Sequence, residues 1–266
     1  MKIARNHKAE AWNIIGGLFW SEGRKSARPT QAEIEMFTAG IPREARCAVV
    51  GASTIDLIEA LLARDLQVSV FDFSSKMCAD LEAALSKPRL RVEMLDITCP
   101  IPLHLTGSQD FILCDRLINR FTTVEAACAL KGMRALLTDR GEIRASVKLG
   151  FYEMDYLMFA GGKETGTLHE FYDSVTQTIN FAKAGDVLDQ ALLSHGSINR
   201  DILLRWYRGR GSETRFSHDS VLELFKRSHE QKQSLDVMRV ATSPDSQSTT
   251  FFFAKHSIGS NQCAAS

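Results

Sequence analysis

The sequence has no stretch suited to a membrane and no excess charge of either sign. No apolar run approaches the ~20 residues that span a bilayer, and the N-terminal stretch MKIARNHKAEAW lacks the apolar core of a signal peptide. The 32 basic residues balance the 32 acidic ones, so no overall field attracts nucleic acid or an anionic membrane. We therefore expect a cytoplasmic protein that binds neither and has a small-molecule substrate; the sequence leaves a homodimer open.

Metal-binding cysteine motifs are also missing. The six cysteines form no C-x-x-C pair, and none is near a histidine at metal-ligand spacing. Most lie in apolar segments, as reduced core cysteines do. We therefore expect no metal. An apolar content of 44% is typical of a soluble globular protein, and 266 residues suffice for one large domain or for one domain with an insert.

The sequence does contain a strand, a glycine turn, a helix and a second strand, in that order, between residues 47 and 72. The apolar run CAVV predicts a buried strand, and Gly51 opens a turn that Ala52 and Ser53 keep narrow. Apolar residues then recur at helical spacing. The second strand ends at Asp72, 21 positions after Gly51. This geometry holds a nucleoside, because the backbone passes close to the ligand and the carboxylate accepts both ribose hydroxyls.

The composition of the turn separates two classes of nucleoside cofactor. A dinucleotide needs G-x-G-x-x-G for its pyrophosphate, whereas the turn here is G-A-S-T-I-D. Asp56, just inside the helix, would repel a pyrophosphate. S-adenosylmethionine has no phosphate, so the turn favours this cofactor over a nicotinamide. An ordinary βαβ unit without a ligand is the alternative.

Three successive predicted strands end in an aspartate. Asp72 is followed by Asp96 after the strand 90–95 and by Asp115 after the strand 109–114. In an open α/β sheet these tips surround the ligand crevice. We expect Asp96 to accept a hydrogen bond from the adenine amine while Ile97 packs on the ring. Phe73 and Met77 follow Asp72, and we expect Met77 to lie against the base, although a methionine at helical spacing is more often core.

The order of these features from residue 48 to 149 resembles a class I S-adenosylmethionine-dependent methyltransferase. The predicted strands 234–241 and 249–255 resemble the closing antiparallel hairpin of that superfamily, so the resemblance covers about two-thirds of the chain. The stretches WNIIGGLFW and RPT, upstream of VVGAST, are similar to a glycine-poor branch that includes enzymes forming azetidine-2-carboxylate. The resemblance implies that Gly51, Asp72 and Asp96 bind the methionine backbone, ribose and adenine. Ser53 and Thr54 replace family glycines.

The expected fold is an α/β, doubly wound, seven-stranded Rossmann-like methyltransferase sheet. Thr30 and Glu33 form a capping-box pattern before it, and we expect Arg28 to reach the carboxylate of the ligand. The expected parts are a helical cap (1–40), the cofactor-binding core (41–150), a helical insert or lid (151–217), the closing helix and hairpin (218–257) and a tail (258–266). The predicted cofactor-binding residues are Arg28, Gly51, Ala52, Ser53, Asp72, Phe73, Met77, Asp96, Ile97 and Asp115.

The insert supplies most of the predicted catalytic residues. Its aromatic residues could face a sulfonium, since cations favour aromatic faces by roughly 0.5–2 kcal/mol, or could form the core of the insert itself. His169 and Glu170 could act as acid and base, and Gly161–Gly162 is the expected hinge. The basic residues of 205–215 are expected to form a solvated face. The predicted catalytic residues are Asn119, Tyr152, His169 and Tyr172.

Three functions fit this sequence. The first is methyl transfer from S-adenosylmethionine to a small molecule in specialised metabolism. The second is intramolecular cyclisation of the same cofactor to azetidine-2-carboxylate and methylthioadenosine, in which the amine attacks the γ-carbon. The third is a non-catalytic binding module, against which the aromatic insert argues mildly.

Overall fold

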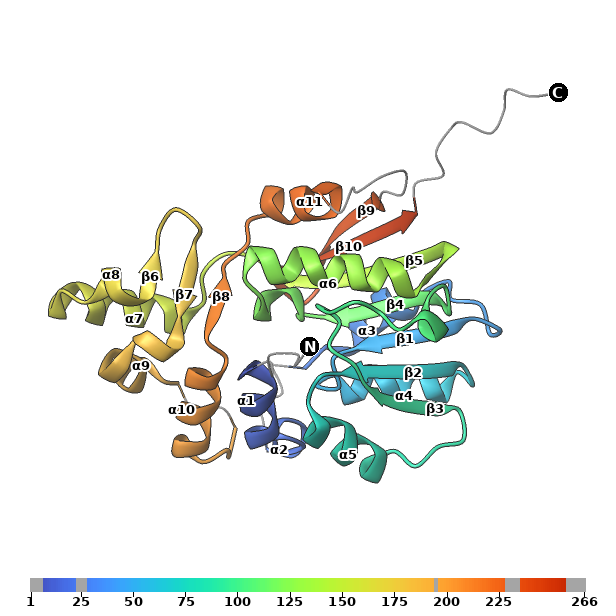
Figure 1. The fold of residues 1–266 in the computed structure, drawn as a ribbon, viewed down its shortest axis with the longest axis horizontal. Coiled ribbons are helices and arrows are strands. Elements are labelled where there is room, and N and C mark those ends of the chain that lie inside the picture. The colour runs from blue at the N-terminus through green and yellow to red at the C-terminus, as the bar shows by residue number, and fades with distance from the viewer. Residues whose placement is uncertain (1–6, 23–27, 194–195, 228–234, 257–266) are drawn as a thin grey trace, which may run out of the picture.

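Strand β1 (Arg46–Val50) lies near the middle of a seven-stranded sheet, and four of its five residues are buried. The computed structural model describes residues 7–22, 28–193, 196–227 and 235–256. The strand order is β3-β2-β1-β4-β5-β10-β9 (Figure 1). The other strands of this sheet are β2 (Gln67–Asp72), β3 (Leu90–Met94), β4 (Gln109–Asp115), β5 (Leu137–Lys148), β9 (Leu235–Ser243) and β10 (Ser246–His256).

The pairing of these strands confirms the predicted fold. β1 pairs in parallel with β2 and β4, β2 with β3, and β4 with β5. β10 is antiparallel to both β5 and β9, which gives the closing hairpin that the sequence predicts. Because the parallel strands run the same way, their carboxyl ends meet at one edge of the sheet.

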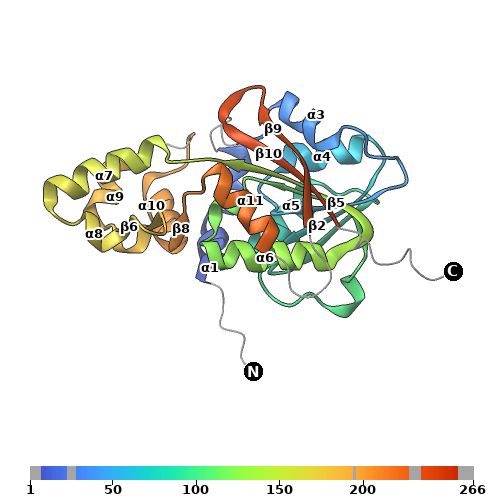
Figure 2. The same ribbon diagram turned by 90° about the horizontal axis from the view of Figure 1, so that it is seen from above.

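Helices cover both faces of the sheet, and their apolar side chains pack with those of the strands in two buried clusters. Figure 2 shows α3 and α4 on the opposite face from α6 and α11. The N-terminal helices α1 and α2 pack in the same cluster as α3, α4 and α5. The helices of this part are α1 (His7–Ile15), α2 (Leu18–Ser21), α3 (Gln31–Thr38), α4 (Ile55–Ala63), α5 (Ser75–Ala84), α6 (Thr123–Leu136) and α11 (His218–Arg227), with the 3-10 helices η2 (Leu103–Leu105) and η3 (Ile118–Arg120).

Local sequence signals explain where two of these helices begin. Thr30 and Glu33 form the predicted capping box at the start of α3. Thr122 and Glu125 form a second box at the start of α6. In α6, Gly132 allows a close approach, because a Cβ there would lie 2.1 Å from the carbonyl oxygen of Ile97. The loop after β3 is therefore pressed directly against this helix.

The insert lies beside the sheet and contains a small sheet as well as helices (Figure 1). Its three strands have the order β6-β7-β8 and are antiparallel, an element that the sequence reading did not include. Its elements are α7 (Glu153–Thr165), α8 (Leu168–Phe171), β6 (Tyr172–Asp173), β7 (Thr178–Asn180), η4 (Phe181–Lys183), α9 (Gly185–Ala191), α10 (Arg200–Gly209) and β8 (Ser212–Thr214).

A register shift in β5 accommodates the extra residues between the Gln109–Leu137 and Phe111–Glu142 pairs. In the insert, one local prediction was wrong. The expected hinge at Gly161–Gly162 lies inside α7. Gly162 instead allows close packing, because a Cβ there would lie 2.8 Å from the ring of Phe171.

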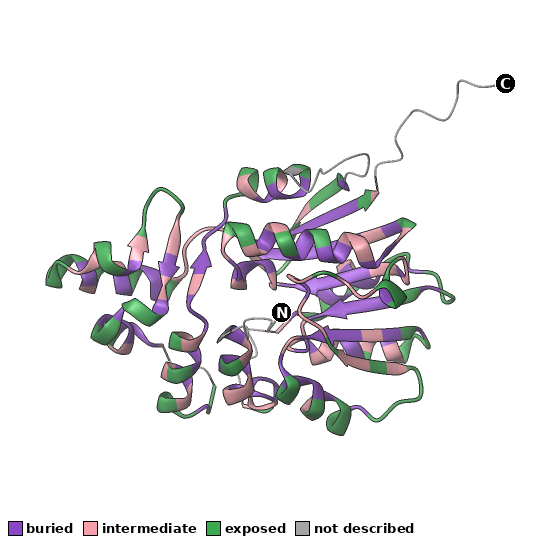
Figure 3. Cartoon of the chain, viewed as in Figure 1, coloured by how far each residue is buried: buried purple, intermediate pink, exposed green. Residues whose placement is uncertain are grey.

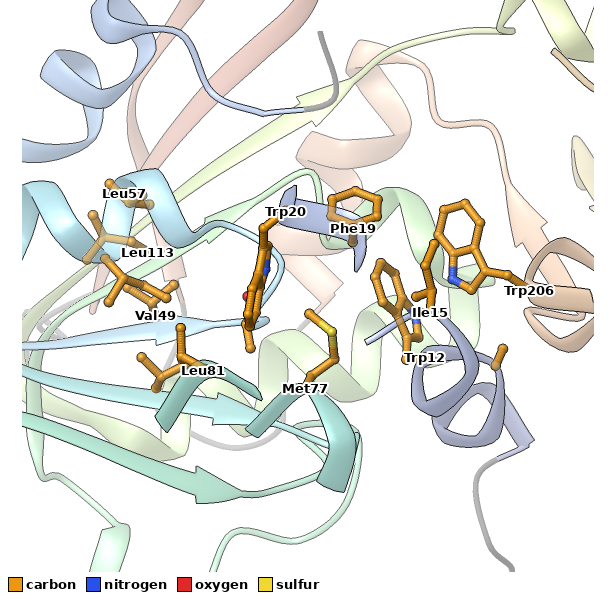
Figure 4. Packing of buried hydrophobic residues seen from close by; sticks show 14 of the residues in the cluster. Trp12, Ile15, Phe19, Trp20, Val49, Leu57, Met77, Leu81, Leu113 and Trp206 are labelled. Carbon is orange, nitrogen blue, oxygen red and sulfur yellow. The ribbon is translucent and has the colours of Figure 1, made fainter. Parts of the chain in front are cut away.

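Buried residues concentrate in the strands and in the helix faces turned toward them (Figure 3). Trp20 lies between the strand residues Val49 and Leu113 on one side and the aromatic group of Trp12 and Phe19 on the other (Figure 4). The predicted tail 258–266 falls outside the described residues. In the described part of the chain, no helix has the length and apolarity needed to cross a membrane.

Candidate functional site

A pocket opens at the carboxyl ends of β1, β2, β4 and β5, where the N-terminal helices and the insert also meet. Lys8 of α1 ties these three parts together: its Nζ donates to Glu125 at 2.6 Å and to the carbonyls of Arg120 at 2.8 Å and Ser212 at 3.0 Å. The pocket is lined by Trp12, Phe19, Gly51, Ser53, Thr54, Asp72, Phe73, Asp115, Arg116, Leu117, Asn119, Arg120, Lys148, Tyr152, Glu153, Met154, Leu193, Tyr207, Arg210 and Arg215.

The glycine turn after β1 forms one wall of the pocket. Gly51 has φ +98°, a conformation that L side chains rarely adopt. A Cβ built on Gly51 would have only Leu117 within 4 Å, at 3.7 Å, so the space over the turn is open. The indole Nε1 of Trp20 donates to the carbonyl of Ala52 at 2.9 Å. Trp20 of α2 therefore holds the glycine turn in place, a role that the sequence did not predict for it.

Asp72 lies next to this turn at the end of β2. Its two carboxylate oxygens accept the backbone N–H groups of Ala52 at 2.8 Å and Ser74 at 2.7 Å. Burial raises the pKa of this carboxyl to about 6, and those two hydrogen bonds oppose the rise. Each oxygen has a second lone pair, so the buried carboxylate retains acceptor capacity toward the pocket.

Asp115, at the end of β4, is engaged by its neighbours. It accepts the hydroxyl of Ser146 at 2.5 Å and the guanidinium of Arg116 at 3.1 Å. Arg116 also binds the buried Glu33 of α3 at 2.7 Å. Burial raises the pKa of the Asp115 carboxyl, while Arg116 and Ser146 oppose that rise. The hydrogen bonds and ion pairs of Glu33, Arg116, Asp115 and Ser146 join α3 to the sheet. The capping-box pattern predicts only that Glu33 caps α3, so the sequence did not predict its pairing with Arg116.

Asn119 lines the pocket, but its side-chain amide is bonded to the backbone. Its Nδ2 donates to the carbonyl of Lys148 at 2.6 Å, and its Oδ1 accepts the N–H of Lys148 at 2.9 Å. Lys148 Nζ in turn lies 4.7 Å from the ring centroid of Tyr152. Asn119 therefore positions the end of β5, rather than offering a free amide to a ligand.

Tyr152 is already in contact with two cations. Besides Lys148, the guanidinium carbon of Arg215 lies 4.2 Å from its ring centroid. Burial raises the pKa of the phenol. A sulfonium placed on this ring would meet two positive charges, so the geometry gives Tyr152 a place in the pocket wall and argues against the cation-facing role expected for it.

The expectation of a solvated basic face at residues 205–215 was wrong for Arg210 and Arg215, which are 1% and 4% exposed. Arg215 forms a bidentate pair with Asp155 at 2.6 and 2.9 Å. Arg210 binds Glu213 at 2.8 and 2.6 Å. Burial would raise the pKa of Glu213, but the guanidiniums of Arg210, Arg120 and Arg215 hold it at about 2. The sequence did contain a signal for this buried group, because Arg210 and Arg215 lie three and two residues from Glu213.

Several predicted cofactor residues lie outside the pocket lining. Arg28 approaches Asp56 of α4 at 3.6 Å. Met77 is fully buried in the core (Figure 4), the alternative that its helical spacing left open. Asp96 accepts the backbone N–H and the hydroxyl of Thr98. Ile97 is 2% exposed.

Two predicted catalytic residues of the insert are also outside the lining. His169 is exposed on α8. Tyr172 packs against Phe159, with ring centroids 4.4 Å apart, and donates its hydroxyl to Gln177 at 3.1 Å. Tyr172 therefore belongs to the core of the insert. Of the predicted residues, the pocket brings together Gly51, Ser53, Asp72, Phe73, Asp115, Asn119 and Tyr152.

The residues of the turn fit a phosphate-free nucleoside cofactor. The open space over Gly51 would accept the ligand chain, and the buried Asp72 would accept hydroxyl donors. Asp56 in the first turn of α4 is paired with Arg28 at 3.6 Å, but the turn offers a single glycine where a pyrophosphate site needs G-x-G-x-x-G. In the part of the chain that the structure describes, no group of three or more His, Cys, Asp or Glu side chains could hold a metal ion.

The structure is similar to many solved structures. One from Rhodobacter sphaeroides, provisionally named a Zn-dependent alcohol dehydrogenase, is 44% identical, with a TM-score of 0.92, and the match covers 96% of this chain and 100% of that one. The metal-binding chemistry in its name has no counterpart among the described side chains here. Neither a protein-family model nor a curated protein matches the sequence.

More distant matches share the fold. A Burkholderia thailandensis 1,6-didemethyltoxoflavin-N1-methyltransferase, solved with its substrate and S-adenosylhomocysteine, has a TM-score of 0.54 at 12% identity, and the match covers 96% of this chain and 91% of that one. A Haloferax volcanii methyltransferase in complex with the Trm112 activator has a TM-score of 0.54 at 11% identity, covering 95% and 97% of the two chains. At these identities the likeness concerns the fold.

Proposed function

We propose that this chain, which has the fold of class I S-adenosylmethionine-dependent methyltransferases, transfers the methyl group of this cofactor to a small molecule in specialised metabolism. The observation that carries the proposal is the joining of Gly51 and Asp72 in one pocket with side chains of the cap and the insert. The cofactor supplies an electrophilic methyl group on a sulfonium. The protein must bind it, orient it and keep water away.

Different residues of the pocket would bind the cofactor, orient it and exclude water. Asp72 would accept the ribose hydroxyls, and Gly51 would let the ligand chain pass close to the backbone. Trp12 and Phe19 of the cap form an apolar wall of the same pocket. Displacement in line at a methyl carbon needs chiefly positioning and exclusion of water when the nucleophile is neutral, so no dedicated base is required of the chain.

Intramolecular cyclisation of the cofactor is the second candidate. The observation that favours it is that cap, core and insert all line one pocket, so this chain's own side chains would surround a ligand bound there. A cyclase needs no acceptor, because the amine and the γ-carbon belong to one molecule. It would have to hold the two ~3–3.5 Å apart and keep the amine neutral.

Binding and product analysis together test these proposals. Calorimetry should show that the protein binds S-adenosylhomocysteine, and the absence of binding would contradict both candidates. Mass spectrometry of the protein with S-adenosylmethionine then separates them. Adenosylhomocysteine that forms only when an acceptor is supplied supports methyl transfer. Methylthioadenosine that forms without an acceptor, well above the uncatalysed background, would replace it with the cyclase.

A further inference from the structure

The end of the pocket away from Asp72 is rich in positive charge. Arg120 follows β4, Lys148 ends β5, and Arg210 and Arg215 come from the C-terminal part of the insert. In the strand order, β1 and β4 separate β2 from β5. At about 4.8 Å per strand, Asp72 and the end of β5 are roughly 14 Å apart across the sheet. A cofactor whose ribose lies at β2 therefore leaves the β4–β5 end of the pocket free for a second ligand.

Nearby carboxylates neutralise only some of these cations. Arg215 pairs with Asp155, and Arg210 pairs with Glu213. The guanidinium of Arg120 comes no closer than 3.9 Å to Glu213, which already binds Arg210 and Arg215. Arg116, also in the lining, has two carboxylates of its own, Asp115 and Glu33.

Arg120 and Lys148 retain unused donors. Among the described residues, neither the Arg120 guanidinium nor the Lys148 ammonium makes a hydrogen bond, and Lys148 has no ion pair. Arg210 is 1% exposed, and its Nη1 has no hydrogen-bond partner. The remaining acid of this end is Glu153, an exposed residue in the first turn of α7. Arg120 and Lys148 are therefore the two cations of the inner end of the pocket that have no carboxylate of the described residues within hydrogen-bonding distance.

The pKa shifts of Arg120 and Lys148 agree with this lack of close carboxylates. Burial lowers the pKa of Lys148, and Arg116, Arg120 and Arg215 lower it further, against an opposing effect of Asp155. Burial and Arg210 lower the pKa of Arg120, against an opposing effect of Glu213. A bound anion would relieve this repulsion, and Arg binds carboxylates with paired N–H donors.

We propose that the methyl acceptor carries a carboxylate, which Arg120 and Lys148 bind at the β4–β5 end of the pocket. This inference rests on the proposed methyl transfer. The same pocket has aromatic walls in Trp12, Phe19 and Tyr207, so a flat ring bearing the carboxylate fits its chemistry. Arg120 and Lys148 then set specificity: a neutral analogue of the acceptor would leave two desolvated cations unpaired.

The test uses benzoate and its neutral isostere benzamide as probes. Each is titrated into the full-length protein saturated with S-adenosylhomocysteine, and binding is followed by calorimetry or by ligand-observed NMR. Benzoate should bind at least tenfold more tightly than benzamide. Arg120→Gln and Lys148→Met should each weaken benzoate at least tenfold and leave benzamide unchanged. Arg205→Gln is the matched control, because Arg205 is an exposed cation of α10 outside the pocket lining.

The possible results separate this inference from the proposal beneath it. Equal binding of the two probes, no benzoate binding, or benzoate binding that ignores both variants would overturn the carboxylate site. A loss of S-adenosylhomocysteine affinity as large as the loss of benzoate affinity would also overturn it, because the cations would then hold the cofactor's own carboxylate. Benzoate binding that depends on both cations, in a parent protein that does not bind S-adenosylhomocysteine, would instead count against the proposed function.

Discussion

The side chain of Asn119 is bonded at both ends to the backbone of Lys148, through hydrogen bonds of 2.6 and 2.9 Å. This pair holds the end of β5 against η3, and it fixes where the Lys148 side chain starts. Asn119 is 1% exposed, so the two bonds are shielded from water. An amide expected to act on a ligand instead positions the strand end from which a pocket cation projects.

Replacing Asn119 by leucine should therefore destabilise the protein. The change leaves a donor and an acceptor of Lys148 without these partners, and each such loss costs about 1–3 kcal/mol. We expect the free energy of unfolding in urea to fall by about 2–5 kcal/mol. A variant as stable as the parent would show that the two bonds contribute nothing.

Asp72→Asn should remove most of the cofactor affinity. The carboxylate is the expected partner of both ribose hydroxyls, and a hydrogen bond to a charged group is worth about 1.5–3 kcal/mol. Affinity for S-adenosylhomocysteine should fall roughly 100-fold, as measured by calorimetry. Asp219→Asn, at an exposed residue of α11, is the control and should bind as the parent does. A change of less than threefold in Asp72→Asn would remove this residue from the ribose site.

The same carboxyl group predicts a pH dependence of binding. Its pKa is raised from 3.8 to about 6 in the folded protein, so the folded state binds this proton more tightly than the unfolded state does. Its contribution to stability is therefore most favourable at low pH and is lost as the pH rises through about 6. Ribose hydroxyls favour the ionised form, so S-adenosylhomocysteine affinity should fall as the pH drops below about 6. Asp72→Asn should flatten this dependence, and a parent profile flat from pH 5 to 7 would contradict it.

Gly51→Ala separates backbone strain from loss of ligand space. Gly51 and Gly40 have φ of +98° and +70°, and neither has backbone near the position of an added Cβ. Alanine at either position should cost about 1–2 kcal/mol of stability through the left-handed backbone. Only Gly51→Ala should also weaken S-adenosylhomocysteine, because only Gly51 lines the pocket. Equal affinity of the two variants would place the ligand elsewhere.

The core of the fold was predictable because its signals are local. A short apolar run, one glycine and an acid at the strand end specify β1, the turn and Asp72 within a single βαβ unit. Thr30 likewise lies three residues from its capping partner, Glu33. These contacts depend on neighbours in sequence, so periodicity and spacing suffice to predict them.

The far end of the pocket was not predictable in this way. Arg215 is bound by Asp155, which is 60 residues away in sequence, and Lys8 meets Glu125 across 117 residues. Nothing local shows that Arg215 will be buried against Asp155, or Lys8 against Glu125. The same reason explains why Tyr172 is found in the insert core and Tyr152 in the pocket wall.

Asp155→Asn tests how strongly that buried pair fixes the insert beside the sheet. The substitution would leave Arg215 buried beside Glu213, which also serves Arg210. Removing one partner of a buried pair costs about 3–5 kcal/mol, because the remaining charge is uncompensated.

The surface pair of Arg200 with Asp189, at 2.7 Å, provides the matched control. Both of its side chains are about half exposed, so Asp189→Asn should cost less than about 1 kcal/mol. Urea unfolding of the two variants beside the parent measures the difference. If Asp155→Asn cost no more than Asp189→Asn, the buried pair would not be what holds Arg215 in the pocket wall, and another contact of the insert would have to do so.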